Sequence, residues 1–211
     1  MEEFDSFIFD LDGTLWDSVD VYIKGWNNIF LRENIPIRFD RRYFERMVGW
    51  NPSDFLRAVL PDYSQQYRER LYCEASEEQL RLYDTSKAFI YPGVIEGLKL
   101  LNRSYRLFIV SNCSKGIIEK FFQQTNTGYC FTGNISHGDN GLSKSENIKY
   151  IVNKHNLKKT VYVGDTVSDK TQSELANVDF IWVSYGFGFV QDYEKMVNCF
   201  SELVSLCQIR S

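Results

Sequence analysis

Acidic, hydroxyl and lysine side chains follow several short apolar runs in this sequence. In chain order they are Asp10, Asp12, Ser111, Asn112, Lys144, Asp165 and Asp169. If the runs are parallel strands, their carboxyl ends meet at one edge of a sheet, which is where open α/β folds bind ligands. Four carboxylates gathered there would repel one another without a cation, and Mg²⁺ prefers oxygen ligands. The pattern therefore predicts a cation and ligand site at that edge.

Each of these residues also has a plain structural explanation. An Asp-x-Asp pair after a strand is commonly a turn stabilised by Asx hydrogen bonds. Ser111 could cap a helix, and Lys144 could be an exposed helix residue. Because such coincidences would have to occur independently and in this order, we interpret the set as one site.

Hydrophobic periodicity indicates the elements that would position the site. Residues 4–9 form a short apolar run typical of a buried strand. Amphipathic helices are expected at residues 19–34, 43–48, 53–60 and 65–83, and further helices at 94–101, 115–122, 145–155 and 170–176. Strands are expected at residues 107–110, 160–163 and 180–183. Strands that alternate with helices predict right-handed crossovers and a mostly parallel sheet covered on both faces.

These elements predict an α/β fold with a doubly wound, Rossmann-like, mostly parallel sheet and an inserted α-helical cap subdomain. The core is expected to comprise residues 1–15 and 87–211, and the cap residues 16–86. The chain has 211 residues, of which 44% are hydrophobic. This length suits one large domain that carries a modest insertion.

Composition argues against several classes of protein. A formal charge of −4 provides no broad positive field for nucleic acid or an anionic membrane. The sequence has no apolar run of about 18 residues and begins without the pattern of a secretory signal, so we expect a cytoplasmic protein. Its five cysteines contain no Cys-x-x-Cys pair, which argues against a disulfide framework or a zinc site.

Four segments together resemble the motifs of the haloacid dehalogenase superfamily of phosphotransferases. They are Asp10-Leu-Asp-Gly-Thr-Leu15, Ser111-Asn112, Lys144 ahead of a helix, and Gly164-Asp165-x-x-x-Asp169. The insertion after the first strand is similar to the helical cap of that family. Within the family, the sequence looks most like phosphoglycolate phosphatase-like enzymes and related sugar-phosphate phosphatases.

The resemblance implies a catalytic role for four residues. Asp10 would attack phosphorus to form an aspartyl-phosphate, and Asp12 would protonate the leaving alcohol and later accept a proton from water. Ser111 and Lys144 would bind the phosphoryl oxygens and offset their charge, with Asn112 as a further phosphate-binding candidate.

The resemblance also implies a metal site that involves four aspartates. Mg²⁺ would be held by Asp10, by the backbone carbonyl of Asp12 and by Asp165, while Asp169 would support the metal waters or Lys144.

Further expectations concern the cap and the last loops. Trp16, Asp17 and the segment 46–51, which begins with Arg46, are candidates to line a substrate pocket. Asn177 stands where relatives usually have glycine, so it should adopt a left-handed conformation. The segment 185–188 resembles the glycine-containing loop near the active site of that family. We assign it no catalytic role, because a tight turn explains a lone Gly-x-Gly equally well.

These inferences point to a Mg²⁺-dependent phosphatase, a monomer or homodimer, that hydrolyses a small phosphorylated metabolite such as phosphoglycolate or a sugar phosphate. Two alternatives remain open. A sugar phosphomutase of the same family would keep the same core residues. A non-catalytic metabolite-binding or protein-binding regulatory module would keep only the fold, although the intact acidic residues argue against it.

Overall fold

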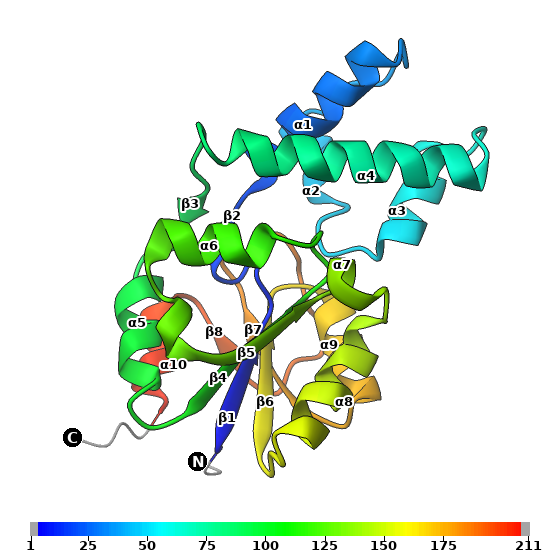
Figure 1. Ribbon diagram of the computed structural model, residues 1–211. Coiled ribbons are helices and arrows are strands. Elements are labelled where there is room, and N and C mark those ends of the chain that lie inside the picture. Colours follow the sequence, from blue (N-terminus) through cyan, green and yellow to red (C-terminus); the bar gives the residue numbers. More distant parts are fainter. Residues whose placement is uncertain (1–3, 208–211) are drawn as a thin grey trace.

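The computed structural model describes residues 4–207, so the outermost parts of the expected core, residues 1–3 and 208–211, lie outside the described residues. Figure 1 shows a sheet with helices on both faces and a helical block above the carboxyl ends of the strands. Among residues 4–207, none of the helices is both long enough and apolar enough to span a bilayer.

The main sheet has six strands in the order β5-β4-β1-β6-β7-β8, and all of the pairings are parallel. The strands are β1 (Ser6–Phe9), β4 (Arg106–Ser111), β5 (Phe131–Ser136), β6 (Thr160–Gly164), β7 (Asp179–Val183) and β8 (Met196–Val197). This order confirms the expected doubly wound fold. The chain moves outward from β1 in one direction and then returns to continue on its other side, so a crevice opens at the carboxyl end of β1.

Alternate side chains of the central strands face opposite layers of helices. Phe7 and Phe9 of β1 point into the layer formed by α5 (Val94–Leu101), α6 (Ile117–Thr125) and α10 (Phe200–Ser205). Ile8 points into the opposite layer, where Ile148 and Ile151 of α8 (Lys144–Lys154) cover the sheet, beside α9 (Val167–Leu175). A strand buried on both faces therefore carries Asp10 to the edge of the sheet.

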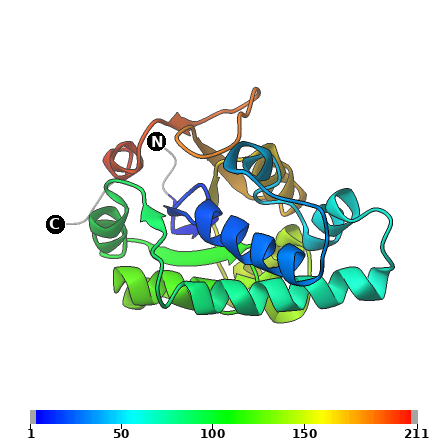
Figure 2. The same ribbon diagram turned by 90° about the horizontal axis from the view of Figure 1, so that it is seen from above.

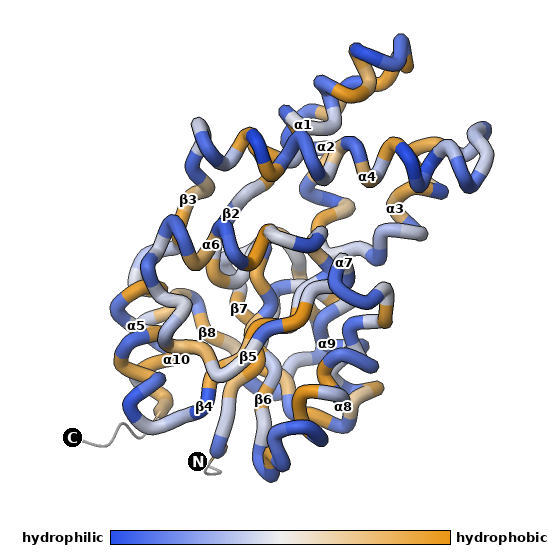
Figure 3. The backbone as a smooth tube through the Cα atoms, in the orientation of Figure 1, coloured by the Kyte–Doolittle hydropathy of each residue, from blue (hydrophilic) through white to orange (hydrophobic). Residues whose placement is uncertain are grey.

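The helical block has a hydrophobic core of its own, which includes Trp26, Phe30, Phe39 and Phe55. It consists of α1 (Val19–Arg32), α2 (Arg41–Glu45), α3 (Pro52–Val59) and α4 (Gln65–Leu82). Figure 2 shows α1 and α4 side by side. In Figure 3, α4 alternates between apolar and polar residues, as expected for a helix with one buried face.

Two short strands join the block to the sheet domain. β2 (Trp16–Asp17) pairs antiparallel with β3 (Phe89–Ile90), so the chain enters and leaves the block at adjacent places. The remaining elements are the 3₁₀ turn η1 (Gly128–Cys130) and the one-turn helix α7 (His137–Asn140).

The helices expected from periodicity are all present, with ends that differ by a few residues. The sequence analysis missed β5, whose residues are Phe-Thr-Gly-Asn-Ile-Ser. β5 lies at the edge of the sheet and is mostly half-buried, so it lacks the continuous apolar run of the central strands. The left-handed conformation expected of Asn177 is confirmed, with a φ of 57°.

Candidate active site

Three neighbouring strands bring the expected polar residues to one edge of the sheet. Asp10 follows β1, Ser111 ends β4 and Asp165 follows β6, and β1 lies between the other two strands. Lys144 is the first residue of α8, which begins there because the Ser143 side chain forms a capping box with Glu146. The structure therefore brings together the residues that the sequence analysis grouped.

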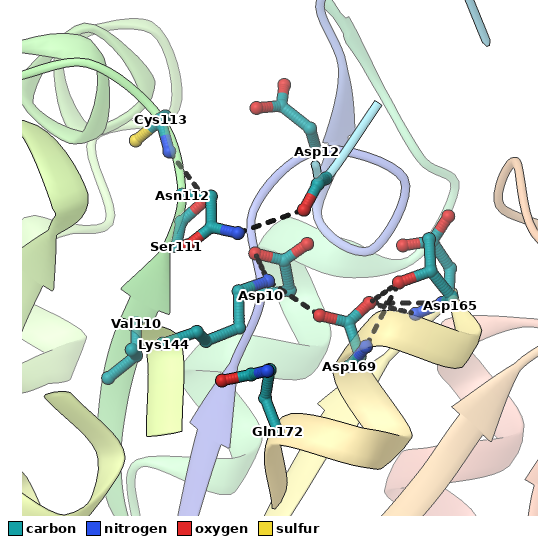
Figure 4. Close-up of polar contacts among 12 residues, drawn as sticks. Asp10, Asp12, Val110, Ser111, Asn112, Cys113, Lys144, Asp165, Asp169 and Gln172 are labelled. Atoms are coloured by element: carbon teal, nitrogen blue, oxygen red, sulfur yellow. Dashed lines mark hydrogen bonds and ion pairs between the residues drawn. The ribbon is translucent and has the colours of Figure 1, made fainter. Parts of the chain in front are cut away.

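Lys144 lies between two carboxylates, as Figure 4 shows. Its Nζ is 3.0 Å from Oδ1 of Asp10 and 2.6 Å from Oδ1 of Asp169, and all three side chains are at most 2% exposed. The other oxygen of Asp169 accepts hydrogen bonds from the backbone N–H and hydroxyl of Thr166, in the capping box that begins α9. Asp169 is thus held by its neighbours and fixes the position of Lys144.

Asp165 is fully buried against backbone that only glycine allows. A Cβ on Gly13 would lie 2.2 Å from Oδ2 of Asp165, and one on Gly186 would lie 2.3 Å from Cβ of Asp165. Oδ2 accepts the N–H of Phe187 at 2.7 Å. Oδ1 has no hydrogen-bond partner among the described residues, although it is buried.

Burial and mutual repulsion make ionisation of these acids unfavourable. Burial raises the pKa of Asp10 to about 7. Lys144 lowers this pKa, whereas Asp169 raises it. Burial also raises the pKa of Asp165 well above its ordinary value, with repulsion from Asp169 and Asp10 as further causes. Burial alone would lower the pKa of Lys144, but the two carboxylates beside it raise it above the ordinary value.

A divalent cation fits this arrangement. Carboxylate oxygens of Asp10, Asp165 and Asp169 lie within 4.8 Å of one another. Oδ1 of Asp165 has no hydrogen-bond partner among the described residues, and a bound cation would be a partner for it. Oxygen donors without nitrogen or sulfur suit Mg²⁺.

Asp12 points to a different set of partners. Its Oδ1 accepts hydrogen bonds from Trp16 Nε1 at 2.9 Å and from the Ser18 hydroxyl, and its Oδ2 accepts one from the Tyr22 hydroxyl at 2.9 Å. Burial raises the pKa of Asp12 to about 6, while these three donors oppose the rise. The two aspartates of the first motif therefore occupy distinct environments.

The loop after β4 connects the sheet edge with the helical block. The Ser111 hydroxyl accepts the N–H of Cys113 at 3.4 Å, and Asn112 Nδ2 donates to the carbonyl of Gly49 at 2.9 Å. Ser114 donates to the Tyr72 hydroxyl at 2.9 Å.

A cavity of about 90 Å³ lies between this loop, Asp10, Asp12 and the helical block. Its other lining residues are Tyr22, Trp26, Phe44, Met47, Val48, Gly49, Trp50, Pro52, Phe55, Tyr72, Gln79, Ser111, Asn112, Cys113 and Ser114. An adjoining cavity reaches Lys144 and shares Trp50 and Asn112 with the first.

Three residues expected in the cavity wall do not line it, namely Trp16, Asp17 and Arg46. Trp16 is fully buried, stacks on Tyr83 at 5.2 Å between ring centroids and donates its N–H to Asp12. Arg46 is exposed. By contrast, the neighbouring segment 47–50 does line the cavity, because the turn after α2 places it beside the loop of Asn112.

Sequence reasoning missed several residues of the site. Tyr22 and Gln79 follow the apolar periodicity of their helices, so the sequence indicates burial but not contact with Asp12 or the cavity. The segment 185–188 was given no catalytic role, and in the structure the Phe187 N–H donates to Asp165. Its Gly-x-Gly pattern was the only signal for this contact.

Comparisons with known proteins agree with this geometry. The family model described as haloacid dehalogenase-like hydrolase matches residues 7–183. The chain is 27% identical over 194 residues to a phosphoglycolate phosphatase of Nitrosococcus oceani, an alignment that covers 85% of this chain and 84% of the relative.

Solved structures show the same fold. A haloacid dehalogenase-like family hydrolase from Streptococcus pneumoniae superposes with a TM-score of 0.83 at 19% identity, covering 98% of this chain and 99% of the other. CbbY from Rhodobacter sphaeroides, in complex with phosphate, superposes with a TM-score of 0.81 at 16% identity, covering 95% and 96%. The chain belongs to the haloacid dehalogenase-like hydrolases, which confirms the resemblance stated from the motifs.

Proposed function

We propose that this protein is a Mg²⁺-dependent phosphatase that hydrolyses a small phosphate monoester through an aspartyl-phosphate. The observation that carries the proposal is that two buried carboxylates line one cavity but have different partners. Asp10 is paired with Lys144, whereas Asp12 is held by three hydrogen-bond donors. The relative from Nitrosococcus oceani, a phosphoglycolate phosphatase, supports the reaction class.

Asp10 is the nucleophile in this mechanism. One carboxylate oxygen attacks phosphorus while the bond from phosphorus to the ester oxygen breaks, and the leaving oxygen takes that electron pair. A carboxylate is adequate because phosphoryl transfer needs mainly alignment and charge neutralisation. Lys144 would supply one fixed positive charge beside the transferring group, and Ser111 and Asn112 would donate hydrogen bonds to its oxygens.

Asp12 is the general acid and base. It protonates the leaving alkoxide in the first step and accepts a proton from the attacking water in the second, which releases inorganic phosphate and restores Asp10. A pKa of about 6 suits a group that gives and takes a proton near neutral pH. Trp16, Ser18 and Tyr22 position this carboxylate.

The metal would be held by Asp10, by the backbone carbonyl of Asp12 and by Asp165, with Asp169 beside it as the anchor of Lys144. When bound, Mg²⁺ neutralises negative charge on the transferring phosphoryl group. The residues 16–86 act as a cap in this proposal, since the helical block supplies one wall of the cavity.

The test is phosphate release from phosphoglycolate, hexose phosphates and neutral monoesters, with Mg²⁺ or with EDTA. We expect metal-dependent release by the wild type, its loss in Asp10→Asn, and its retention in Asp62→Asn, which changes an exposed carboxylate. Acid quenching of a single turnover should trap phosphate on the wild-type chain but not on Asp10→Asn. Equal phosphate release by the wild type and Asp10→Asn would show that Asp10 is not the nucleophile.

A further inference from the structure

The cavity beside Asp10 and Asp12 is unusual in its charge. Among the described residues that line it, Asp10 and Asp12 are the only carboxylates, and none is Lys, Arg or His. We propose that the leaving group of the preferred substrate is uncharged and is recognised by aromatic surface and by the amide of Gln79. This inference rests on the proposed phosphatase function and specifies its substrate class.

Six of the seventeen described residues that line the cavity are aromatic. The Trp26 ring lies 5.2 Å from that of Phe55, the Phe55 ring lies 5.9 Å from that of Phe44, and the Phe44 ring lies 6.2 Å from that of Tyr22. Rings packed on one another present a fixed apolar surface. An anionic leaving group placed against them would lose its hydration without gaining a counter-charge, which is costly.

The cations near the cavity have other partners or positions. Lys144 is paired with Asp10 and Asp169, so it serves the phosphoryl end of the substrate. Arg41 forms ion pairs with Asp17, Asp20 and Glu45. Arg46 is exposed and outside the lining. A second negative charge on the substrate would therefore meet two carboxylates and no Lys, Arg or His among the described residues of the wall.

Gln79 provides the polar contact that such a leaving group needs. It belongs to α4, is only 4% exposed and lines the cavity. Its amide is not among the fully buried polar groups that lack a partner, so the cavity can reach it. Gly25 of α1 makes room for it, since a Cβ there would lie 2.6 Å from Cγ of Gln79. An amide that faces a cavity can form hydrogen bonds with a polar group of the ligand that fills the cavity.

An amide can donate and accept, so it suits a hydroxyl, carbonyl or amide of the substrate. Sites that hydrogen-bond a neutral group discriminate strongly against analogues that lack it. Gln79 is thus a specificity-determining residue, and the aromatic wall selects for an uncharged body.

The test compares phosphoglycolate with the phosphate ester of glycolamide, which has nearly the same shape but replaces the carboxylate by an amide. We expect kcat/KM for the glycolamide ester to exceed that for phosphoglycolate by roughly tenfold or more, equivalent to about 1.4 kcal/mol. Phenyl phosphate should also be hydrolysed, because its ring fits the aromatic wall.

Variants of Gln79 separate recognition from folding. Gln79→Met keeps the length of the side chain and should lower kcat/KM for the glycolamide ester while leaving that for phenyl phosphate within about twofold. Gln79→Lys should shift the preference toward phosphoglycolate. As a measurement independent of turnover, quenching of Trp26 and Trp50 fluorescence in Asp10→Asn should give tighter binding of the glycolamide ester than of phosphoglycolate.

The possible failures are distinguishable. Absence of phosphate release from every ester would refute the phosphatase function, and the substrate class would fall with it. If kcat/KM for phosphoglycolate equalled or exceeded that for the glycolamide ester, only the proposed substrate class would be refuted. If that preference were lost in Arg46→Gln, the exposed arginine would be the group that turns in to bind the carboxylate. Equal substrate ratios in the wild type and Gln79→Met would exclude Gln79 from recognition.

Discussion

Lys144 is a buried cation between two buried carboxylates, with Nζ 3.0 Å from Asp10 and 2.6 Å from Asp169. Removing one partner of a buried ion pair leaves uncompensated charge, which costs about 3–5 kcal/mol. We therefore expect Lys144→Met to lower the free energy of unfolding by about that amount near neutral pH and to abolish phosphate release.

Urea denaturation measures this change. The matched control is Lys149→Met, an exposed lysine of the same helix, which should change the free energy of unfolding by less than about 0.5 kcal/mol. If Lys144→Met were as stable as this control, the ammonium would not be the counter-charge of the two carboxylates.

Single residues were predictable from sequence where their position in the chain determines their position in space. Asp10, Ser111 and Asp165 could be grouped because parallel strands end at one edge of a sheet. Tyr22 and Gln79 could not, because helical periodicity identifies a buried face without showing which polar group or cavity that face meets.

At the scale of elements, the turn after β1 depends on a glycine. Gly13 has a φ of 84°, and a Cβ there would lie 2.2 Å from Oδ2 of Asp165. Gly141 has a φ of 72° and nothing within 4 Å of its Cβ position. Both positions carry the backbone cost of a left-handed alanine, about 1–2 kcal/mol, but only Gly13→Ala must also displace a buried carboxylate.

We therefore expect Gly13→Ala to be clearly less stable than Gly141→Ala in thermal unfolding, and to lose phosphate release, whereas Gly141→Ala should retain it. Equal stability and activity of the two variants would mean that Asp165 does not depend on the close approach of this turn.

The pairing of α1 with α4 includes an acid whose titration should affect stability. Glu33, just after α1, accepts hydrogen bonds from Arg70 Nη2 at 2.7 Å and the Tyr67 hydroxyl at 2.9 Å, both on α4. These hydrogen bonds, that of Arg70 first, lower the pKa of Glu33 below its ordinary value of 4.5.

Because the folded-state pKa is lowered, the stabilisation is present above pH 4.5 and is lost as pH falls through the lower folded-state value. Glu33→Gln should thus be slightly less stable than the wild type at pH 7, and the difference should disappear in acid. Glu77→Gln, which changes a 68% exposed carboxylate, is the control. A difference that persisted unchanged at pH 3 would show that packing rather than charge stabilises this contact.

Elements were predictable where burial makes their pattern strong. The two-sided burial of β1 and the amphipathic faces of α1 and α4 are visible in the sequence, whereas β5 is a polar edge strand and was missed. The antiparallel pairing of β2 with β3 involves two residues in each strand, too few for any periodicity to appear.

For the whole molecule, the sequence identified the fold class and the family, but not the character of the cavity. That cavity is formed by α1, α2, α3 and α4 together with the loop after β4, so its lining depends on how the helical block meets the sheet. The exposed position of Arg46 and the burial of Trp16 follow from this packing and not from their neighbours in sequence.

The charge balance at the sheet edge would link the proposed metal binding to the stability of the whole protein. Asp10, Asp165 and Asp169 are buried together, and Lys144 provides a single positive charge among them. Burial and repulsion raise the pKa of Asp165 well above its ordinary value, so its ionised form destabilises the metal-free protein. A ligand that binds only the folded state stabilises it, by about 2.7 kcal/mol at a hundredfold excess over its Kd.

We therefore expect saturating Mg²⁺ to raise the Tm of the wild type by roughly 5–10 °C, given about 2–4 °C per kcal/mol for a chain of this size. Asp165→Asn removes a repelling charge and a proposed metal ligand. The metal-free variant should therefore be at least as stable as the metal-free wild type, with a Tm that barely responds to Mg²⁺. Asp179→Asn, which changes an exposed aspartate at the start of β7, should respond like the wild type. A full Mg²⁺ response in Asp165→Asn would place the metal elsewhere, whereas a metal-free Asp165→Asn less stable than the wild type would show that its carboxylate is favourable without the cation.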